Sequence, residues 1–220
     1  MSTTSVSKLL EQMSNYDKDE RYMACSDLHN QVVSSTTQFD ASLERRICAA
    51  VLLRLDDANN DVQSIAVKTL GAILLKVRDN AVLTIADALT KSMFDDSKAA
   101  LRDIYTIGLK KLLVTVPAKT GGPVAHSLVQ RLLGGVSQGA DQSVTLSCLS
   151  CLADCLDRFP SHLADSHESI MATALHQLQF GEGGVVKKKV IGMMGVIAGA
   201  VSDALLGRLV ETLLTLMNGE

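Results

Sequence analysis

The stretch NNDVQSIAVKTLGAILLKV, from Asn59 to Val77, contains the pattern that decides the fold. Its apolar residues recur every three or four positions, which places them on one face of a helix. These residues are Val62, Ile65, Ala66, Leu70, Ile73 and Val77. Asp61 stands just before the run, where an N-cap residue is expected. The stretch therefore predicts an amphipathic helix with one buried face.

The pair formed by Ala66 and Leu70 recurs along the chain. Residues four apart share a helix face, and a small residue lets a neighbouring helix come close. The small or apolar position is matched by Ala24, Gly108, Cys148 and Val190, and the large one by Leu28, Leu112, Leu152 and Met194. The steps from residue 28 to 70, 112, 152 and 194 are 42, 42, 40 and 42 residues, as in HEAT or armadillo repeats.

Each of these helices follows another amphipathic helix, so the repeat unit is a helix pair. We expect first helices at about 5–14, 42–55, 81–94, 121–135, 165–179 and 203–217. We expect second helices at about 18–35, 61–78, 98–116, 141–159 and 184–201. Turns rich in Gly, Asp, Asn and Ser separate them, at 56–61, 93–98, 134–141 and 180–184.

The sequence thus predicts an all-α superhelix of HEAT/armadillo type, a single solenoid over residues 1–220. One helix pair cannot bury its apolar face alone, whereas a stack buries a continuous core and leaves an extended wall that binds other proteins. The expected repeats span about 5–36, 42–78, 81–116, 121–159 and 165–201, with an incomplete one at 203–220. Because the last apolar helix lacks a partner, we expect an N-terminal piece of a longer protein or a truncated gene product.

Composition excludes several function classes. The net charge of −3 argues against a nucleic-acid partner, which needs a concentrated positive field. The sequence contains no apolar run long enough to span a membrane, and its first twenty residues lead us to expect no signal peptide. Its five cysteines are therefore expected as reduced thiols, in the cytoplasm and nucleus.

Three phrases resemble the N-terminal region of the cullin-associated, neddylation-dissociated protein family. They are DKDERYMACSDL (17–28), DVQSIAVKTLGAI (61–73) and LRDIYTIGLKKLL (101–113), and LLEQM (9–13) and QRLLGGVSQG (130–139) fit as well. The resemblance runs in order over almost the whole chain and is looser from Leu146 onward.

This resemblance implies a non-catalytic scaffold without a cofactor or a small-molecule substrate. Members of the family wrap around cullin–RING ubiquitin ligase cores whose cullin lacks its ubiquitin-like modification. They block that modification and assist substrate-receptor exchange in the assembly of SCF-type complexes. The implied partner of the N-terminal repeats is the cullin C-terminal region with its RING subunit. The far C-terminal repeats, which compete with the receptor adaptor, are absent here. The alternative is a HEAT scaffold of another assembly, such as a transport receptor or a phosphatase scaffold.

The second helices are expected to line the concave wall, and five of their residues lie off the core stripe. These candidate partner-binding residues are Ser64, Lys68, Thr106, Lys110 and Lys188. A basic ladder there would suit an acidic partner surface, although a plain solvated face gives the same pattern.

Three other patterns hint at chemistry. Cys148, Cys151 and Cys155 share a helix face and precede His162 and His167, and these are residue types that bind zinc. Cys148 also occupies the core position of the repeat, where a free cysteine packs well as a small buried residue. We interpret these cysteines as core residues, and an enzyme or metal protein that uses this segment is the second alternative.

Glycine and carboxylate clusters have equally simple interpretations. Residues 181–184 followed by Lys187 resemble a phosphate loop, but neither a preceding strand nor a following Ser or Thr is present, which favours a turn. Asp56–Asp57 and Asp95–Asp96 occupy matching places after first helices, where aspartate can cap the next helix. We predict no catalytic, cofactor-binding or metal-binding residues.

Overall fold

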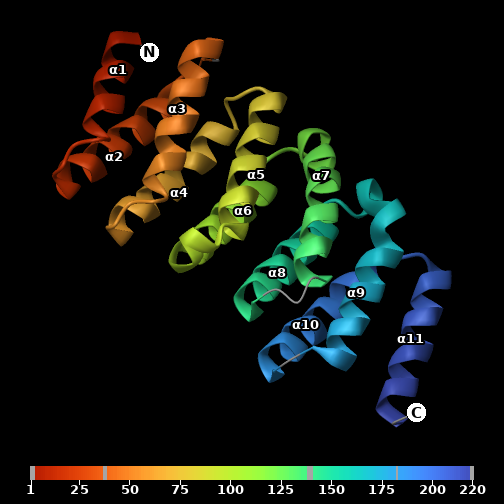
Figure 1. The fold of residues 1–220 in the computed structure, drawn as a ribbon. Coiled ribbons are helices and arrows are strands. Elements are labelled where there is room, and N and C mark those ends of the chain that lie inside the picture. The colour runs from red at the N-terminus through yellow and green to blue at the C-terminus, as the bar shows by residue number, and fades with distance from the viewer. Residues whose placement is uncertain (1–2, 37–38, 138–140, 182, 219–220) are drawn as a thin grey trace. The chain divides into compact units, whose positions relative to one another are not determined.

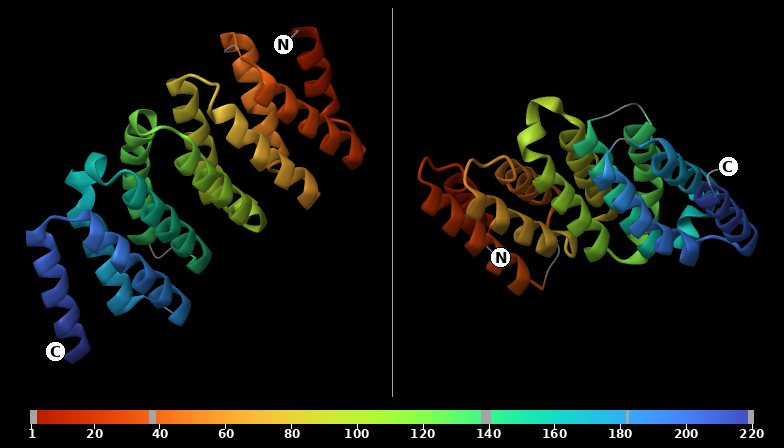
Figure 2. Two further views of the ribbon diagram at one scale, coloured as in Figure 1. Left: turned by 180° about the vertical axis from the view of Figure 1, so that it is seen from behind. Right: turned by 90° about the horizontal axis from the view of Figure 1, so that it is seen from below.

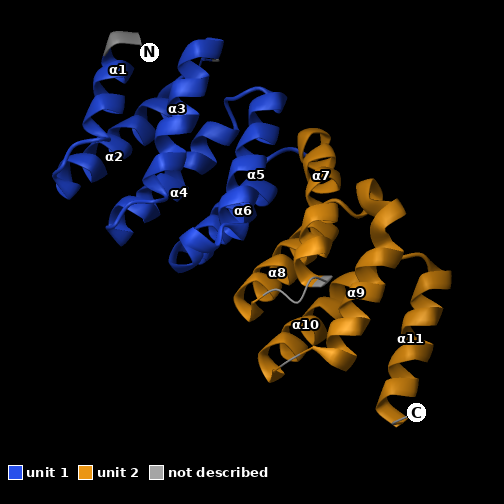
Figure 3. Ribbon diagram, in the orientation of Figure 1, with its two compact units in different colours: residues 1–117 blue, residues 118–220 orange. Residues whose placement is uncertain are grey.

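The computed structural model describes residues 3–36, 39–137, 141–181 and 183–218, which fold into α-helices and two short 3₁₀ helices (Figure 1). The chain divides into two compact units, unit 1 (Met1–Pro117) and unit 2 (Ala118–Glu220) (Figure 3). Each unit is described by itself. The single solenoid expected over residues 1–220 stays a prediction.

Unit 1 contains three helix pairs. Their helices are α1 (Thr3–Gln12), α2 (Lys18–Ser34), α3 (Ala41–Arg54), α4 (Asn60–Leu74), α5 (Asp79–Phe94) and α6 (Arg102–Thr115), with the 3₁₀ helix η1 (Asp96–Leu101) before α6. The second helix α4 packs between α2 and α6, and the first helix α3 packs between α1 and α5. Figure 2 shows the three second helices of this unit side by side.

Unit 2 repeats the same arrangement. Its helices are α7 (Ala118–Ser137), α8 (Gln142–Arg158), α9 (His167–Phe180), α10 (Gly184–Ala200) and α11 (Asp203–Asn218), with the 3₁₀ helix η2 (Pro160–Ser166) before α9. The second helices α8 and α10 pack on each other, α9 contacts α7, and α11 packs on α9. None of the helices in the described ranges combines the length and apolar character that a membrane span requires.

The helix pairs lie within a few residues of the expected ranges, with three differences. The second helix expected at 61–78 ends at Leu74. The second helix expected from residue 98 begins at Arg102, because residues 96–101 form η1. Arg102 is buried there, and its Nε donates to the carbonyl of Met93 at 3.0 Å. The first helix expected from residue 165 begins at His167, after η2. The expected turns at 134–141 and 180–184 fall partly on residues 138–140 and 182, which lie outside the described residues.

The predicted core stripe is confirmed, with two corrections, of which the first is Val77: it lies after the end of α4 and is half-buried. All five small positions are buried, and so are four of the five large ones: Leu28, Leu70, Leu112 and Leu152. In the fifth repeat the buried residue is Met193, whereas Met194 is half-buried. Residues three and four positions after Val190 both lie near its helix face, so α10 can turn either methionine inward.

Capping residues fix where the second helices begin. The Asn59 side chain accepts hydrogen bonds from the backbone N–H groups of Asp61 and Val62 and is the N-cap of α4. The prediction that Asp61 is this cap is wrong, since Asp61 lies in the first turn, where its charge favours the helix dipole. Asp17 caps α2 in the same way, by accepting from the N–H of Asp19 at 2.8 Å.

Gly108 marks a point in unit 1 where neighbouring apolar side chains leave little space. A Cβ added there would come 3.1 Å from Cδ2 of Leu89 and 3.7 Å from side-chain carbons of Leu55 and Leu70. These neighbours belong to α5, the end of α3 and α4, so a first helix, a turn and a second helix meet at this glycine. The repeat therefore needs a small residue at this position.

We expect Gly108→Leu to destabilise the protein, because overpacking a filled core costs about 1–3 kcal/mol. The matched control is Gly195→Leu on α10, where an added Cβ meets nothing within 4 Å. There the better helix propensity of leucine should leave stability unchanged or raise it by up to about 1 kcal/mol. Urea unfolding followed by circular dichroism measures both, and equal effects at the two glycines would contradict the packing argument.

Candidate protein-binding surface

The candidate residues of unit 1 lie on the outward face of its second helices. Ser64 and Lys68 are exposed on α4, while Thr106 and Lys110 are half-buried on α6. The hydroxyl of Thr106 donates to the carbonyl of Arg102 at 2.9 Å, so its polar atom is turned back to its own helix. The face is thus assembled from two adjacent helices, with the lysines as its charged part.

Lys68 reaches toward the neighbouring helix α2. Burial lowers the pKa of His29 on α2, and the positive charge of Lys68 lowers it further. Among the residues that the structure describes, the buried Nδ1 atom of His29 has no hydrogen-bond partner. The imidazole therefore stays neutral at neutral pH and adds no positive charge beside Lys68.

Lys111 adds a cation that the sequence analysis missed. A Cβ added at the buried Gly71 of α4 would collide with Cε of Lys111, so the stem of this α6 lysine lies across the glycine. Lysine commonly packs its alkyl chain on an apolar surface while its ammonium stays in water. Gly71 thus provides the space for Lys111 to cross from one second helix to the next.

Apolar residues alternate with these lysines. Ile107 and Val114 on α6 are 50% and 59% exposed. With Lys110 and Lys111 they follow the i, i+3, i+4, i+7 spacing of a single helix face. The sequence shows this spacing, but it gives no sign that Ile107 and Val114 lie outside the buried core stripe of α6. Exposed apolar surface rimmed by charge is typical of a protein-interaction site.

Lys188 is the candidate residue of unit 2. It is exposed on α10 and lines a groove between α8 and α10. The structure thus places the five candidate residues on second helices, four in unit 1 and one in unit 2. Their role in binding stays a prediction.

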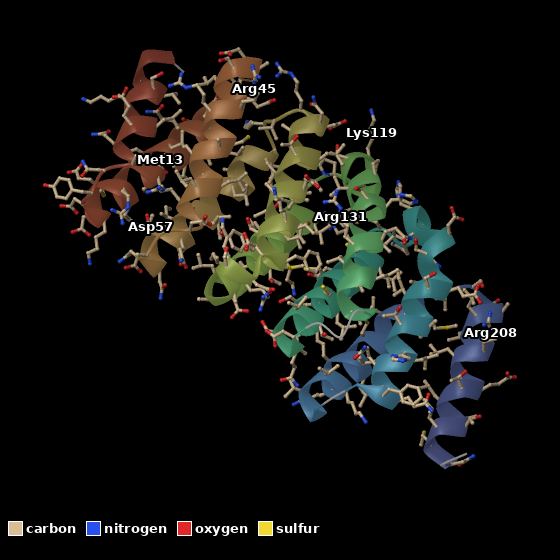
Figure 4. All side chains as sticks on the ribbon, viewed as in Figure 1. Met13, Arg45, Asp57, Lys119, Arg131 and Arg208 are labelled. Atoms are coloured by element: carbon tan, nitrogen blue, oxygen red, sulfur yellow. The ribbon has the colours of Figure 1, made fainter. Side chains whose placement is uncertain are left out.

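Asp57 is the centre of an ion-pair cluster after α3 (Figure 4). The guanidinium of Arg21 on α2 donates to both of its carboxylate oxygens at 2.7 Å, and Arg54 Nη1 donates to Oδ2 at 3.2 Å. The Asp57 carboxylate also accepts from the N–H of Asn59 at 3.1 Å. Only 2% of its side chain is exposed, so this carboxylate stabilises the fold and faces no substrate.

Asp56 faces the opposite side of the same turn. Its Oδ2 accepts from Lys98 Nζ at 2.6 Å, and its Oδ1 accepts from the hydroxyl of Tyr105. The two adjacent carboxylates therefore diverge toward different repeats. The interpretation of these aspartates as helix caps is wrong, because Asn59 caps α4; Asp95 does cap the next element, η1, through the N–H of Ser97.

Three equivalent positions converge on this turn. Arg21, Gln63 and Tyr105 each lie three residues before the small core position of successive repeats. Arg21 binds the Asp57 carboxylate, Gln63 donates to the Asp57 carbonyl at 2.7 Å, and Tyr105 binds Asp56. The turn is thus a junction of three repeats, which we call the Asp56–Asp57 junction.

We expect Asp57→Ala to cost about 3 kcal/mol of stability, because it strands partly buried guanidinium groups. Burial alone would raise the pKa of Asp57, but hydrogen bonds from Arg21 and Asn59 and the charges of Arg21 and Arg54 hold the pKa below its ordinary value of 3.8. The contribution is therefore present above pH 3.8 and is lost as the pH falls through the lower folded-state pKa.

Chemical denaturation at pH 7 and at pH values below 4 measures this contribution. Asp95→Ala, in the acidic pair that follows the next first helix, is the control; its exposed carboxylate should matter much less. A loss for Asp57→Ala that is no larger than for Asp95→Ala would refute the junction.

The cysteine segment is a core helix in unit 2. Cys148, Cys151 and Cys155 on α8 are all fully buried. His167 Nε2 is bonded to the carbonyl of Pro160 at 3.0 Å, while the His162 ring meets Phe159 edge-on. In the part of the chain that the structure describes, no three His, Cys, Asp or Glu side chains are grouped as metal ligands.

We expect the thiols to react slowly with a disulfide reagent in the native protein and all five to react after unfolding. All five cysteines are buried. Burial raises the pKa of Cys25 and of Cys48 to about 11 and also raises the pKa of Cys155, so little reactive thiolate forms at pH 7. Metal analysis of the purified protein is the companion measurement, and stoichiometric zinc would overturn the core interpretation.

The glycine-rich segment before α10 is a turn in the residues described. Gly183 is the N-cap of α10 and has a φ of +84°, a conformation that glycine adopts readily. The helix α9 precedes this segment, whereas a phosphate loop follows a strand, so the interpretation as a turn between helices holds. Glu182 lies outside the described residues.

Stacked helix pairs with a buried small–large stripe and an outward polar face define a HEAT/armadillo-type repeat protein. No family model matches the sequence. The solved Kap95:Nup1 complex shares the fold with a TM-score of 0.64 at 14% identity, covering 90% of this chain and 25% of that one. Computationally designed armadillo repeat proteins for modular peptide recognition match with a TM-score of 0.50 at 14% identity, covering 94% and 87%. The all-α HEAT/armadillo prediction is confirmed.

Sequence comparison finds this chain similar to the cullin-associated NEDD8-dissociated proteins. It is 36% identical to cullin-associated NEDD8-dissociated protein 2 of Mus musculus over 219 residues, which is 97% of this chain and 18% of that relative. It is 34% identical to protein 1 of Drosophila melanogaster, over 90% of this chain and 16% of that relative. A protein of Emericella nidulans described as the N-terminal part of protein 1 is 26% identical over 96% of this chain and 70% of its own length. The resemblance to the N-terminal region is confirmed, and the chain spans less than a fifth of the first two relatives.

Proposed function

We propose that this chain is a non-catalytic protein-binding scaffold that binds the unmodified cullin–RING ligase core. The cullin C-terminal region with its RING subunit is the proposed partner. By occupying that core, the scaffold would block neddylation and assist substrate-receptor exchange. We propose the cytoplasm and nucleus as its location.

The observation that carries this proposal is the similarity of nearly the whole chain to proteins named for their association with cullins. The 36% identity over 219 residues extends through every helix pair, so the likeness exceeds the small–large spacing that unrelated repeat proteins share. The match covers 18% of that relative, and binding by this chain alone is therefore part of the proposal.

The outward face of the second helices supports the proposal physically. On α6, Lys110 and Lys111 supply positive charge between the exposed Ile107 and Val114, and Lys68 adds charge on the adjacent α4. Complementary charge speeds association and selects partners, while buried apolar contacts contribute most of the affinity. A face of this kind suits a protein surface that carries carboxylates next to apolar groups.

Co-elution of the 220-residue chain with a purified cullin C-terminal half and its RING subunit tests the proposal. The cullin is supplied first unmodified and then carrying NEDD8. We expect co-elution with the unmodified form alone. Absence of co-elution with both forms, from a chain shown to be folded, would contradict binding by this chain, and equal co-elution with both would contradict selectivity.

The variant Lys68→Glu/Lys110→Glu should weaken that complex at least tenfold, about 1.4 kcal/mol or more. The matched control is Lys8→Glu/Lys91→Glu, which changes the net charge equally but places both reversals at exposed positions on first helices. Isothermal titration of each variant with the unmodified cullin half gives the two affinities. If both pairs weaken binding equally, the second-helix face is not the contact surface.

A further inference from the structure

A groove runs along the second-helix face of unit 2, between α8 and α10. Its volume is about 450 Å³, which lies within the range of ligand-binding pockets. The residues that line it are Leu146 and Ala153 from α8 and Val185, Lys188, Lys189, Gly192 and Met193 from α10. The lining is thus apolar apart from two lysines, as far as the described residues show.

The floor of the groove is held open by a glycine. A Cβ added at Gly192 would meet nothing within 4 Å, so the helix surface above it is empty. Met193 is buried next to it, while Val185 is 61% exposed at the start of α10. An apolar side chain entering here would cover surface that is otherwise in contact with water, which favours binding.

The two lysines are placed differently. Lys189 Nζ donates to the hydroxyl of Ser150 on α8 at 3.1 Å, so this ammonium is tethered across the groove. Lys188 is exposed on the same helix. A carboxylate at the groove would meet one ammonium held in position and a second that can move to it. Charge-assisted hydrogen bonds of this type are shorter and stronger than neutral ones.

We propose that this groove binds an acidic segment of a protein partner, with a carboxylate at Lys188 and Lys189 and an apolar side chain over Gly192. The proposal deepens the proposed function, because it names the chemistry of one contact on the second-helix face. The charge of the lining selects carboxylates, and the apolar floor favours a peptide over a free anion or a nucleic-acid backbone. Recognition of cullin and recognition of such a segment can nevertheless be tested separately.

The test uses the full chain and a fluorescein-labelled peptide, Glu-Leu-Glu-Leu-Glu, with Gln-Leu-Gln-Leu-Gln as the neutral probe. We expect fluorescence anisotropy to show saturable binding of the acidic probe and at least tenfold weaker binding of the neutral one. Lys188→Glu should weaken the acidic probe at least tenfold. Gly192→Leu, which fills the groove without changing charge, should weaken it to a similar degree.

Lys187→Glu is the matched control, because it makes the same change in net charge at a neighbouring residue that does not line the groove. Its effect should stay below threefold. Equal losses for Lys187→Glu and Lys188→Glu, unaltered binding by Gly192→Leu, or equal affinity for the two probes would each overturn the proposal.

The same variants separate this proposal from the proposed function. If probe binding depends on Lys188 and Gly192 while cullin fails to co-elute, the groove holds and the cullin assignment fails. If cullin co-elutes but the probe does not bind, the groove proposal fails and the proposed function holds.

Discussion

Close packing around one buried position in each second helix, seen most directly at Gly108, is the constraint on which the structure depends. At Gly108 a first helix, a turn and a second helix all come within van der Waals distance of the same backbone position. Protein interiors are packed too densely to accommodate extra atoms at such a point. The large residue four positions later then faces inward as well, and together they commit one face of every second helix to the core. The opposite face is left to water, and its residues are free to serve recognition.

That division explains why the candidate surface consists of lysines and exposed apolar side chains and contains no reactive constellation. A helix face offers side chains in a fixed register but does not close around a substrate, which suits contact with another folded protein. Glycines adjust this face locally: Gly71 makes room for the stem of Lys111, and Gly192 leaves a depression between two helices. The cysteines that suggested chemistry lie instead in the core, Asp56 and Asp57 lie in ion pairs, and Asp95 caps η1.

The sequence predicts what depends on periodicity and misses what depends on contacts between distant residues. The four-residue spacing of Ala66 and Leu70 located the core of the first four second helices, because a buried helix face repeats regularly. It could not choose between Met193 and Met194, which are adjacent and lie near the same face. The pairing of Arg21 with Asp57 crosses 36 residues and requires two helix pairs to be stacked before it can be seen. The position of Lys188 on an outward face was predicted, whereas the groove beside it needs α8 and α10 together.

The Asp56–Asp57 junction has a consequence for how unit 1 comes apart. In repeat arrays each repeat couples to its neighbours, so ends held by weak interfaces fray one repeat at a time. Here α2, α4 and α6 each contribute a side chain that bonds to the same turn, at Asp56 and Asp57. If either outer helix pair unfolds, a carboxylate of the middle helix pair loses a hydrogen-bond donor. Amide hydrogen exchange in the three helices should therefore be governed by one shared opening, which makes unit 1 a single cooperative foldon.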